Sequence, residues 1–196
     1  MILDSYARNH NGKYPKITGT TSITIRLDGD TMRELQDEAN RTGIGVNNLA
    51  KQILTNYARW DKFVSKAGMM PVAKEVISQA FDRLNEDEVV QLATSVGKNA
   101  LSDIILFMKG KIDLNSLLSW LELWLKRNST AGFSHVVENG LHICIMKHNL
   151  GSKSSLYYKV VLQLVLKEIL GEFSIVQVNM AENILVFKFK EYNTKR

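Results

Sequence analysis

The chain has 196 residues, with 25 Lys and Arg against 20 Asp and Glu, one Cys, two Pro and 45% hydrophobic residues. This length suits one or two small domains, and the apolar fraction excludes disorder for the bulk of the chain. A single cysteine and the absence of a Cys-x-x-Cys pair exclude a disulfide scaffold and a four-cysteine zinc module. The N-terminus has no apolar signal-peptide core, and no stretch of about 18 apolar residues occurs, so we expect a soluble intracellular protein without a membrane span.

Positive charge is concentrated near the N-terminus. Residues 1–27 contain one acidic residue, Asp4, and four basic ones, Arg8, Lys13, Lys16 and Arg26. Residues 1–20 are polar, so we expect a flexible basic arm there. Such arms often lie along nucleic-acid phosphates, and Lys13 and Lys16 are the expected contacts. A solvated tail is the alternative.

Residues 21–66 contain one strand pattern followed by two helix patterns. Ser22–Leu27 alternates polar and apolar residues, which predicts a half-buried strand. Asp30 is expected to cap a first helix that ends at Gly43. A second helix is expected from Val46 to Phe63. The expected apolar faces are Met32, Leu35 and Ala39 in the first helix and Leu49, Ala50, Ile53, Leu54 and Tyr57 in the second.

The predicted strand has no partner nearby in the sequence. An isolated strand leaves its backbone donors and acceptors unpaired, and no second strand pattern appears before residue 132. Pairing with the same strand of a second chain solves this, because the helices of both chains can then cover the apolar side of the two-stranded ribbon. The sequence therefore predicts an obligate homodimer, with a tetramer as the alternative.

Strand, turn, helix, glycine turn and helix follow one another within roughly residues 20–63. The residues in question are Ser22–Leu27, Met32–Leu35, Arg41–Leu49 and Ile53-Leu54. This order resembles the ribbon-helix-helix DNA-binding family of the MetJ, Arc and CopG type. The family often has Ser or Thr at the position of Gly45, and a glycine there supplies no hydroxyl to a phosphate.

The resemblance implies that a two-stranded ribbon enters the major groove. The family reads DNA bases with three alternate strand positions, which here are Ser22, Thr24 and Arg26. The N-terminus of the second helix is expected to hold a phosphate through its backbone N–H groups, with Lys51 adding charge one turn later. The backbone groups are those of Gly45, Val46, Asn47 and Asn48. An ordinary polar strand face and a solvated helix end are the alternatives.

Residues 70–128 predict a helical region, and residues 132–196 predict a ββαββ region, which makes the fold class α+β. Pro71 is expected to open a helix of about 72–84. Further helices are expected at about 85–96, 101–108 and 113–127, with Trp120 and Trp124 in the core or at a subunit contact. Predicted strands Phe133–Val137 and Leu141–Lys147 flank an Asn-Gly turn, and Phe173–Met180 and Ile184–Lys190 form a second hairpin. Between the hairpins, Ser152–Ser155 is expected to cap a helix ending near Gly171.

Several residues in the C-terminal region have side chains that can bind metals or anions. His142, Cys144, Met146 and His148 share one face of a predicted strand and are all soft-metal ligands. His142 and His148 would lie ~20 Å apart along that strand, so we prefer a packed face and predict neither metal nor cofactor. The segment from His148 to Ser154 lacks the spacing of a nucleotide-binding P-loop and is expected to be a capped helix start. No catalytic motif occurs, and no catalytic residue is predicted.

We therefore expect a sequence-specific double-stranded DNA-binding homodimer, a transcriptional regulator of the prokaryotic cytoplasm that associates with the nucleoid and is not an enzyme. Residues 70–196 are expected to add oligomerisation, effector sensing or partner recruitment. One alternative is an antitoxin-type DNA-binding protein with a protein partner. Another is a C-terminal domain that senses a small ligand or metal, or is an enzyme, and uses the N-terminal module only to dimerise.

Overall fold

Local capping interactions mark the helix ends in the computed structural model, which describes residues 21–128, 132–171 and 176–190. The Asn85 side chain accepts from the Glu88 N–H while Glu88 accepts from the Asn85 N–H, a reciprocal pair that opens one helix. Gly43 and Gly110, with φ of 69° and 77°, end two others. The helices are α1 (Gly29–Thr42), α2 (Val46–Asn56), η1 (Tyr57–Asp61, π-helical), α3 (Lys62–Val64), α4 (Lys74–Arg83), α5 (Glu86–Ser95), η2 (Val96–Ala100, π-helical), α6 (Leu101–Lys109), α7 (Leu114–Asn128) and α8 (Ser152–Leu170).

The chain divides into two compact units, unit 1 (Met1–Met69) and unit 2 (Met70–Arg196). Unit 1 contains α1, α2, η1 and α3. Unit 2 joins the helical region and the ββαββ region that the sequence separated, because α5 packs along α8 and α7 contacts the sheet.

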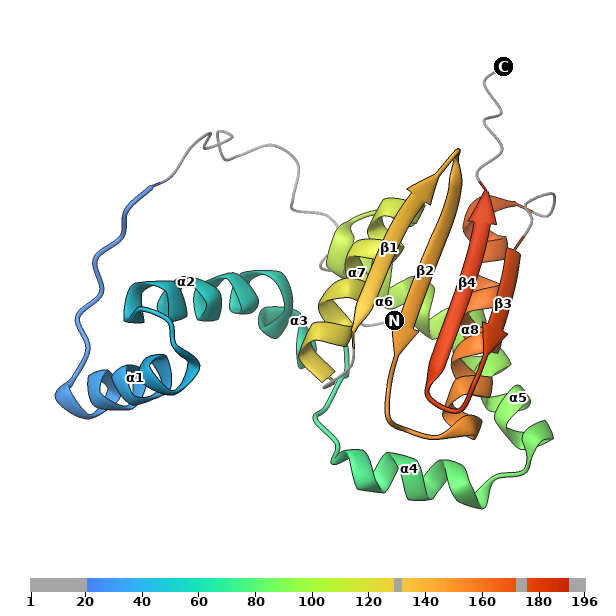
Figure 1. Ribbon diagram of the computed structural model, residues 1–196, viewed down its shortest axis with the longest axis horizontal. Helices are drawn as coiled ribbons and strands as arrows, with labels where there is room; N and C mark the ends of the chain where they lie inside the picture. The colour runs from blue at the N-terminus through green and yellow to red at the C-terminus, as the bar shows by residue number, and fades with distance from the viewer. Residues whose placement is uncertain (1–20, 129–131, 172–175, 191–196) are drawn as a thin grey trace. The chain divides into compact units, whose positions relative to one another are not determined.

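Unit 2 is built on a four-stranded antiparallel sheet of order β1-β2-β4-β3 (Figure 1). Asn139 and Gly140 have φ of 50° and 76°, as a type I′ hairpin turn requires, and this turn places Glu138 opposite Leu141. Both predicted hairpins are present, and the α+β fold class is confirmed. Residues 173–175 of the third predicted strand lie outside the described part of the chain. The strands are β1 (Phe133–Glu138), β2 (Leu141–Lys147), β3 (Val176–Met180) and β4 (Ile184–Lys190).

The core of unit 2 lies between the sheet and its helices, which cover one face (Figure 1). Phe187 and Phe189 of β4 are fully buried, as are Val165 and Leu166 of α8. Removing either phenylalanine side chain from such a site costs roughly 3–5 kcal/mol. The two tryptophans of α7 stack with ring centres 5.7 Å apart. Trp120 is 6% exposed, which confirms the core interpretation for this residue, whereas Trp124 is half-buried.

Two predictions about the helical region were wrong. Pro71 does not open a helix: residues 71–73 have no regular structure, and α4 begins at Lys74 behind an extended Ala73. The expected break between residues 96 and 101 is also absent, because η2 carries the helix from α5 into α6. Gly97 makes this path possible, since a Cβ there would lie 3.1 Å from the Leu164 Cδ1 atom and 3.5 Å from the Val161 Cα atom of α8.

Within the described ranges, none of the helices has the length and apolar character that a membrane crossing requires.

Candidate nucleic-acid interface

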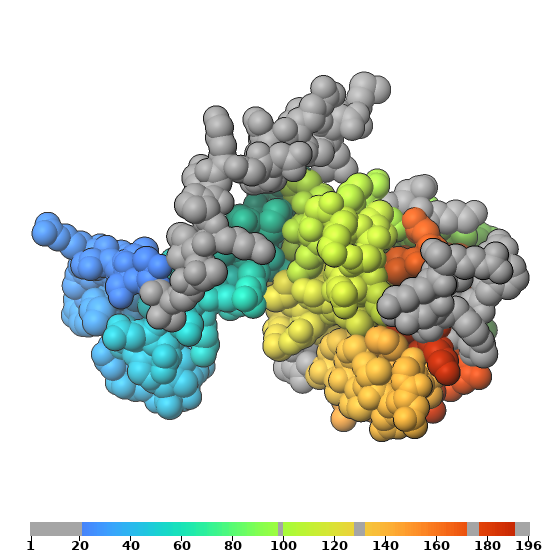
Figure 2. All heavy atoms as spheres, turned by 90° about the horizontal axis from the view of Figure 1, so that it is seen from above, coloured from blue at the N-terminus to red at the C-terminus, as the bar shows by residue number. Residues whose placement is uncertain are grey.

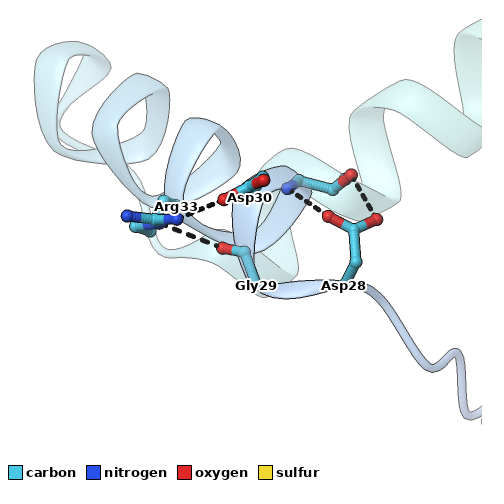
Figure 3. Close-up of polar contacts among 5 residues, drawn as sticks. Asp28, Gly29, Asp30 and Arg33 are labelled. Atoms are coloured by element: carbon cyan, nitrogen blue, oxygen red, sulfur yellow. Dashed lines mark hydrogen bonds and ion pairs between the residues drawn. The ribbon is translucent and has the colours of Figure 1, made fainter.

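The start of α1 is fixed by Asp28, not by Asp30 as the sequence predicted. Asp28 has extended backbone angles, and its carboxylate accepts from the Thr31 N–H and from the Thr31 hydroxyl, each at 2.8 Å (Figure 3). These hydrogen bonds hold the pKa of the Asp28 carboxyl below its usual value. Asp30 lies within the first turn, where it forms an ion pair with Arg33. The helix therefore begins two residues earlier than predicted, at Gly29.

The turn between α1 and α2 agrees with the sequence prediction. Gly43 is left-handed, and the Ile44 N–H donates to the Ala39 carbonyl at 3.0 Å. Gly45 is the N-cap of α2 and makes no side-chain capping bond. Ala39 and Leu49 are buried, at 0% and 9% exposure, so α1 and α2 pack through these two residues.

The predicted phosphate site lies at an accessible helix end. Gly45, Asn47, Asn48 and Lys51 are exposed and Val46 is half-buried. The Asn48 N–H already donates to the Gly45 carbonyl at 2.9 Å. The helix geometry thus leaves the N–H groups of Val46 and Asn47, in the first turn, as the best-placed donors to an anion.

The predicted base-reading residues precede α1 in a segment with no regular secondary structure. Ser22, Thr24 and Arg26 are exposed, and no strand within the described residues pairs with residues 21–28. Their apolar neighbours are exposed as well: Ile23 at 69%, Ile25 at 53% and Leu27 at 48%. In a single chain, residues 22–27 therefore do not form the predicted strand, and their polar and apolar side chains are both open to solvent. Lys13 and Lys16 lie outside the described residues.

Unit 1 exposes many of the residues that the sequence assigns to its core. The exposed large apolar side chains belong to the segment before α1, to α1, and to the end of α2 and its continuation. They are Ile23, Ile25, Leu27, Met32, Ile53, Leu54 and Tyr57. We call this set the open apolar residues of unit 1. Exposed apolar surface on this scale, in so small a unit, is typical of a protein–protein contact.

In unit 2, His148 and Ser155 form a buried hydrogen-bonded chain. The Leu150 N–H donates to His148 Nδ1 at 3.2 Å, so the imidazole proton resides on Nε2, which lies 2.9 Å from the Ser155 Oγ atom. Ser155 in turn donates to the Glu182 carbonyl at 3.0 Å. The histidine is thus a donor to the serine and not a base, and both side chains are buried, at 4% and 0% exposure. The arrangement is structural.

The metal-ligating residue types of β2 occupy one packed face. Cys144 and Met146 are buried, and burial raises the pKa of the Cys144 thiol to about 12. His148 follows the end of β2, with its N–H bound to the Asn183 carbonyl. Within the described residues, no group of three or more His, Cys, Asp or Glu side chains is placed to hold a metal ion.

The sequence analysis overlooked His135, which the structure places beside His142. Their Nε2 and Nδ1 atoms are 2.9 Å apart. The ring centres are 5.1 Å apart and the planes differ by 15°, so the rings meet edge to edge. Burial and the neighbouring His142 lower the pKa of His135. The Asn139-Gly140 turn implies this register, because antiparallel pairing about it places His135 opposite Cys144 and diagonal to His142.

The segment from His148 to Ser154 holds α4 and α8 together. Gly151, with φ of 85°, is the N-cap of α8, and its N–H donates to Asn183 Oδ1 at 3.0 Å. Ser152 is the first helical residue, so the predicted Ser152–Ser155 cap was wrong. Lys153 Nζ donates to the Asp82 and Leu84 carbonyls at the end of α4, where a cation is favourable. The preferred interpretation as a helix start with a turn glycine agrees with these contacts.

The chain matches no protein-family model, and comparison with curated proteins gave no match.

Proposed function

We propose that the protein is a sequence-specific double-stranded DNA-binding homodimer that acts as a transcriptional regulator. In this proposal, residues 22–27 of two chains pair as an antiparallel ribbon, and Arg26, Thr24 and Ser22 enter the major groove. The observation that carries the proposal is the exposure of Ile23, Ile25 and Leu27 in the segment before α1. Helix α2, which packs on α1, also has exposed apolar residues.

A second chain supplies what this segment needs. Pairing of the two copies satisfies their backbone groups, and it turns the three apolar side chains toward the open apolar residues of α1 and α2. Burial of each such aliphatic side chain contributes roughly 1.5–3 kcal/mol. The opposite face of the ribbon then carries Ser22, Thr24 and Arg26 alone.

Charge and helix geometry support DNA as the ligand. Arg26 is exposed and forms no ion pair within the described residues, whereas Arg33 and Arg41 in α1 are each paired with an acidic neighbour. The α2 N-terminus offers backbone donors to a phosphate, with Lys51 one turn away. A β-ribbon fits the major groove, and an arginine there can bind guanine O6 and N7 together.

The decisive experiment uses the full chain and a duplex enriched from a random library by repeated selection. Competition with a scrambled duplex compares Arg26→Ala with Arg41→Ala, which also removes one positive charge. We expect Arg26→Ala to reduce the preference for the selected duplex by about 1–3 kcal/mol per half-site and Arg41→Ala to leave it unchanged. Failure to enrich any sequence, or equal effects of both variants, would overturn the proposal.

A further inference from the structure

β1 is an unprotected edge of the unit 2 sheet. Among the described residues it pairs only with β2, and all side chains from Ser134 to Glu138 are exposed. Val136 and Val137 point to opposite faces of the sheet, yet each is 52% exposed. The β1–β2 hairpin lies at the surface of the space-filling view, coloured yellow to orange (Figure 2).

The hydrogen bonding of β2 fixes which backbone groups of β1 face outward. The Lys147 N–H donates to the Gly132 carbonyl at 3.0 Å, so Gly132 directs its backbone toward β2. The direction alternates along a strand, so Ser134, Val136 and Glu138 also face β2. The N–H and C=O groups of Phe133, His135 and Val137 therefore point to the open edge.

The sequence of β1 lacks the usual protection of an edge strand. Natural edges carry lysine, proline, a bulge or an inward charge, which prevent pairing with another chain. Residues 133–137 contain no Pro, Lys, Arg, Asp or Glu, and their register with β2 is continuous, without a bulge. These five uncharged residues before Glu138, with exposed valines on both faces, are suited to pair with another strand.

We propose that β1 pairs with β1 of a second copy of this chain, antiparallel and with His135 opposite His135. A two-fold axis perpendicular to the sheet keeps the helix-covered faces of both copies on the same side. Only residues whose side chains lie on the same face of the sheet can then lie opposite each other, so the possible registers differ by two residues. The register centred on His135 places Phe133 opposite Val137 twice, and all three outward-facing residues of each copy then exchange hydrogen bonds.

The absence of charge on the edge favours the second copy as the partner. A strand with a charged sequence would find no complementary charge between residues 133 and 137, whereas a second β1 brings none that repels. In the proposed register Glu138, the first charged residue, lies opposite Gly132, away from the Glu138 of the other copy. The contact is isologous, so it closes on itself as a dimer of unit 2. It does not depend on the ribbon proposed for unit 1.

The test traps this contact in the full chain with a single added cysteine. Because His135 lies directly opposite Cys144 of β2, the test uses a Cys144→Ser background, in which the new thiol has no partner on its own chain. There, His135→Cys places two thiols on opposed residues of the two copies about 5.5 Å apart between Cα atoms, within the range that a disulfide spans. Asn179→Cys is the matched control, because Asn179 is also exposed and lies on β3 at the other edge of the sheet. In this background we expect disulfide-linked dimers from His135→Cys and none from Asn179→Cys or from the Cys144→Ser parent, which contains no cysteine.

A second pair of variants tests the hydrogen bonds themselves. Val137→Pro removes an outward N–H and leaves the bonds to β2 intact, whereas Val137→Thr keeps the N–H and nearly the same shape. In the His135→Cys background, proline should weaken cross-linking by about tenfold or more, since one bond is lost on each side of the axis. Threonine should not.

Circular dichroism and thermal unfolding establish that the variants fold. No cross-link in folded His135→Cys, equal cross-linking of Asn179→Cys, or cross-linking that persists in folded Val137→Pro would overturn the β1 contact. An Ile25→Asp substitution, which disrupts the ribbon proposed for unit 1, should leave this cross-link in place. Loss of specific DNA binding with a retained cross-link would thus concern the proposed function and not the edge.

Discussion

The imidazole of His148 and the hydroxyl of Ser155 are 2.9 Å apart and form one buried hydrogen-bonded chain with Leu150 and Glu182. Burial lowers the pKa of His148 from 6.5 to about 4. The Leu150 N–H donates to Nδ1, so a proton at that nitrogen displaces this bond and places a charge among apolar side chains.

This relationship predicts that the protein loses stability in mild acid. The unfolded chain takes up the His148 proton near pH 6.5 and the folded chain only near pH 4. The stabilisation is therefore complete above pH 6.5 and is lost progressively as the pH falls toward 4. The change is on the order of 3 kcal/mol. Urea unfolding at several pH values measures it, and a His148→Gln variant, unable to titrate, should lose most of the slope. An unchanged slope would contradict the burial assigned to His148.

The close approach of η2 and α8 at Gly97 limits the size of the side chain that this position accepts. Gly97→Val should destabilise the protein by about 1–3 kcal/mol, because the Leu164 side chain and the Val161 backbone leave no room. Gly97→Ala should cost less, since a helical alanine recovers up to about 1 kcal/mol of backbone entropy. Gly29→Ala is the matched control, because nothing lies within 4 Å of a Cβ at that first helical residue. Thermal unfolding of the three variants measures the difference.

Substitutions at Asp28, the observed N-cap of α1, and at Asp30, the predicted one, test which residue caps the helix. Asp28→Ala should reduce the helix content of the full chain measured by circular dichroism, because the Thr31 N–H loses its acceptor. Asp30→Ala removes only an exposed ion pair and should change the spectrum little. The reverse order of effects would place the cap at Asp30. Because the pKa of Asp28 is depressed, its contribution should be present at neutral pH and fall as the pH drops below 3.8.

Ile25 tests the assembly of unit 1. Ile25→Asp places a charge where the proposed ribbon packs on the helices, so it should dissociate the unit 1 dimer and abolish specific DNA binding. Thr24→Asp is the matched control for charge: it should weaken DNA binding through phosphate repulsion while the dimer persists. Sedimentation at low micromolar concentration in a Val137→Pro background, which weakens the proposed β1 contact, distinguishes the two. Specific binding by a folded Ile25→Asp monomer would exclude the ribbon.

Cys144 should be chemically inert in the folded protein. Its side chain is fully buried and the pKa of its thiol is raised to about 12, so it has almost no thiolate at pH 8. We expect alkylation to be slow in buffer and fast in denaturant. Cys144→Ser should lose about 1–2 kcal/mol by placing a hydroxyl in the core and leave DNA binding unchanged. Rapid labelling of the native chain would indicate that this face of β2 opens.

The elements of unit 2 were predictable where the signal is local. Asn139-Gly140 defines its hairpin by backbone conformation alone, and Asn85 with Glu88 defines a helix start. The predicted roles of Pro71 and Ser152 were wrong because proline and serine each occur both just before a helix and at its first positions. Contacts with distant residues determine where these two helices begin. Lys153 binds the end of α4, and Asn183 binds Gly151, across long stretches of sequence. His135 was overlooked because its partner depends on strand register.

The candidate interface of unit 1 is a different case. Gly43 and Gly45 lie where local rules place them, and the exposure of Ser22, Thr24 and Arg26 follows from their polarity. The pairing of Ser22–Leu27 has no intrachain determinant, because its predicted partner is another molecule. No contact within one chain can therefore distinguish the base-reading face of that segment from its apolar face.

The edge-to-edge contact of His135 and His142 has a consequence for the tautomers of the two rings. The facing Nε2 and Nδ1 atoms share one hydrogen, so one neutral ring donates and the other accepts. The donor ring then has its lone pair on the far nitrogen, and the acceptor ring has its N–H there. The tautomer of a residue on β1 therefore determines the tautomer of a residue on β2, and the direction of their hydrogen bond belongs to the pair of strands.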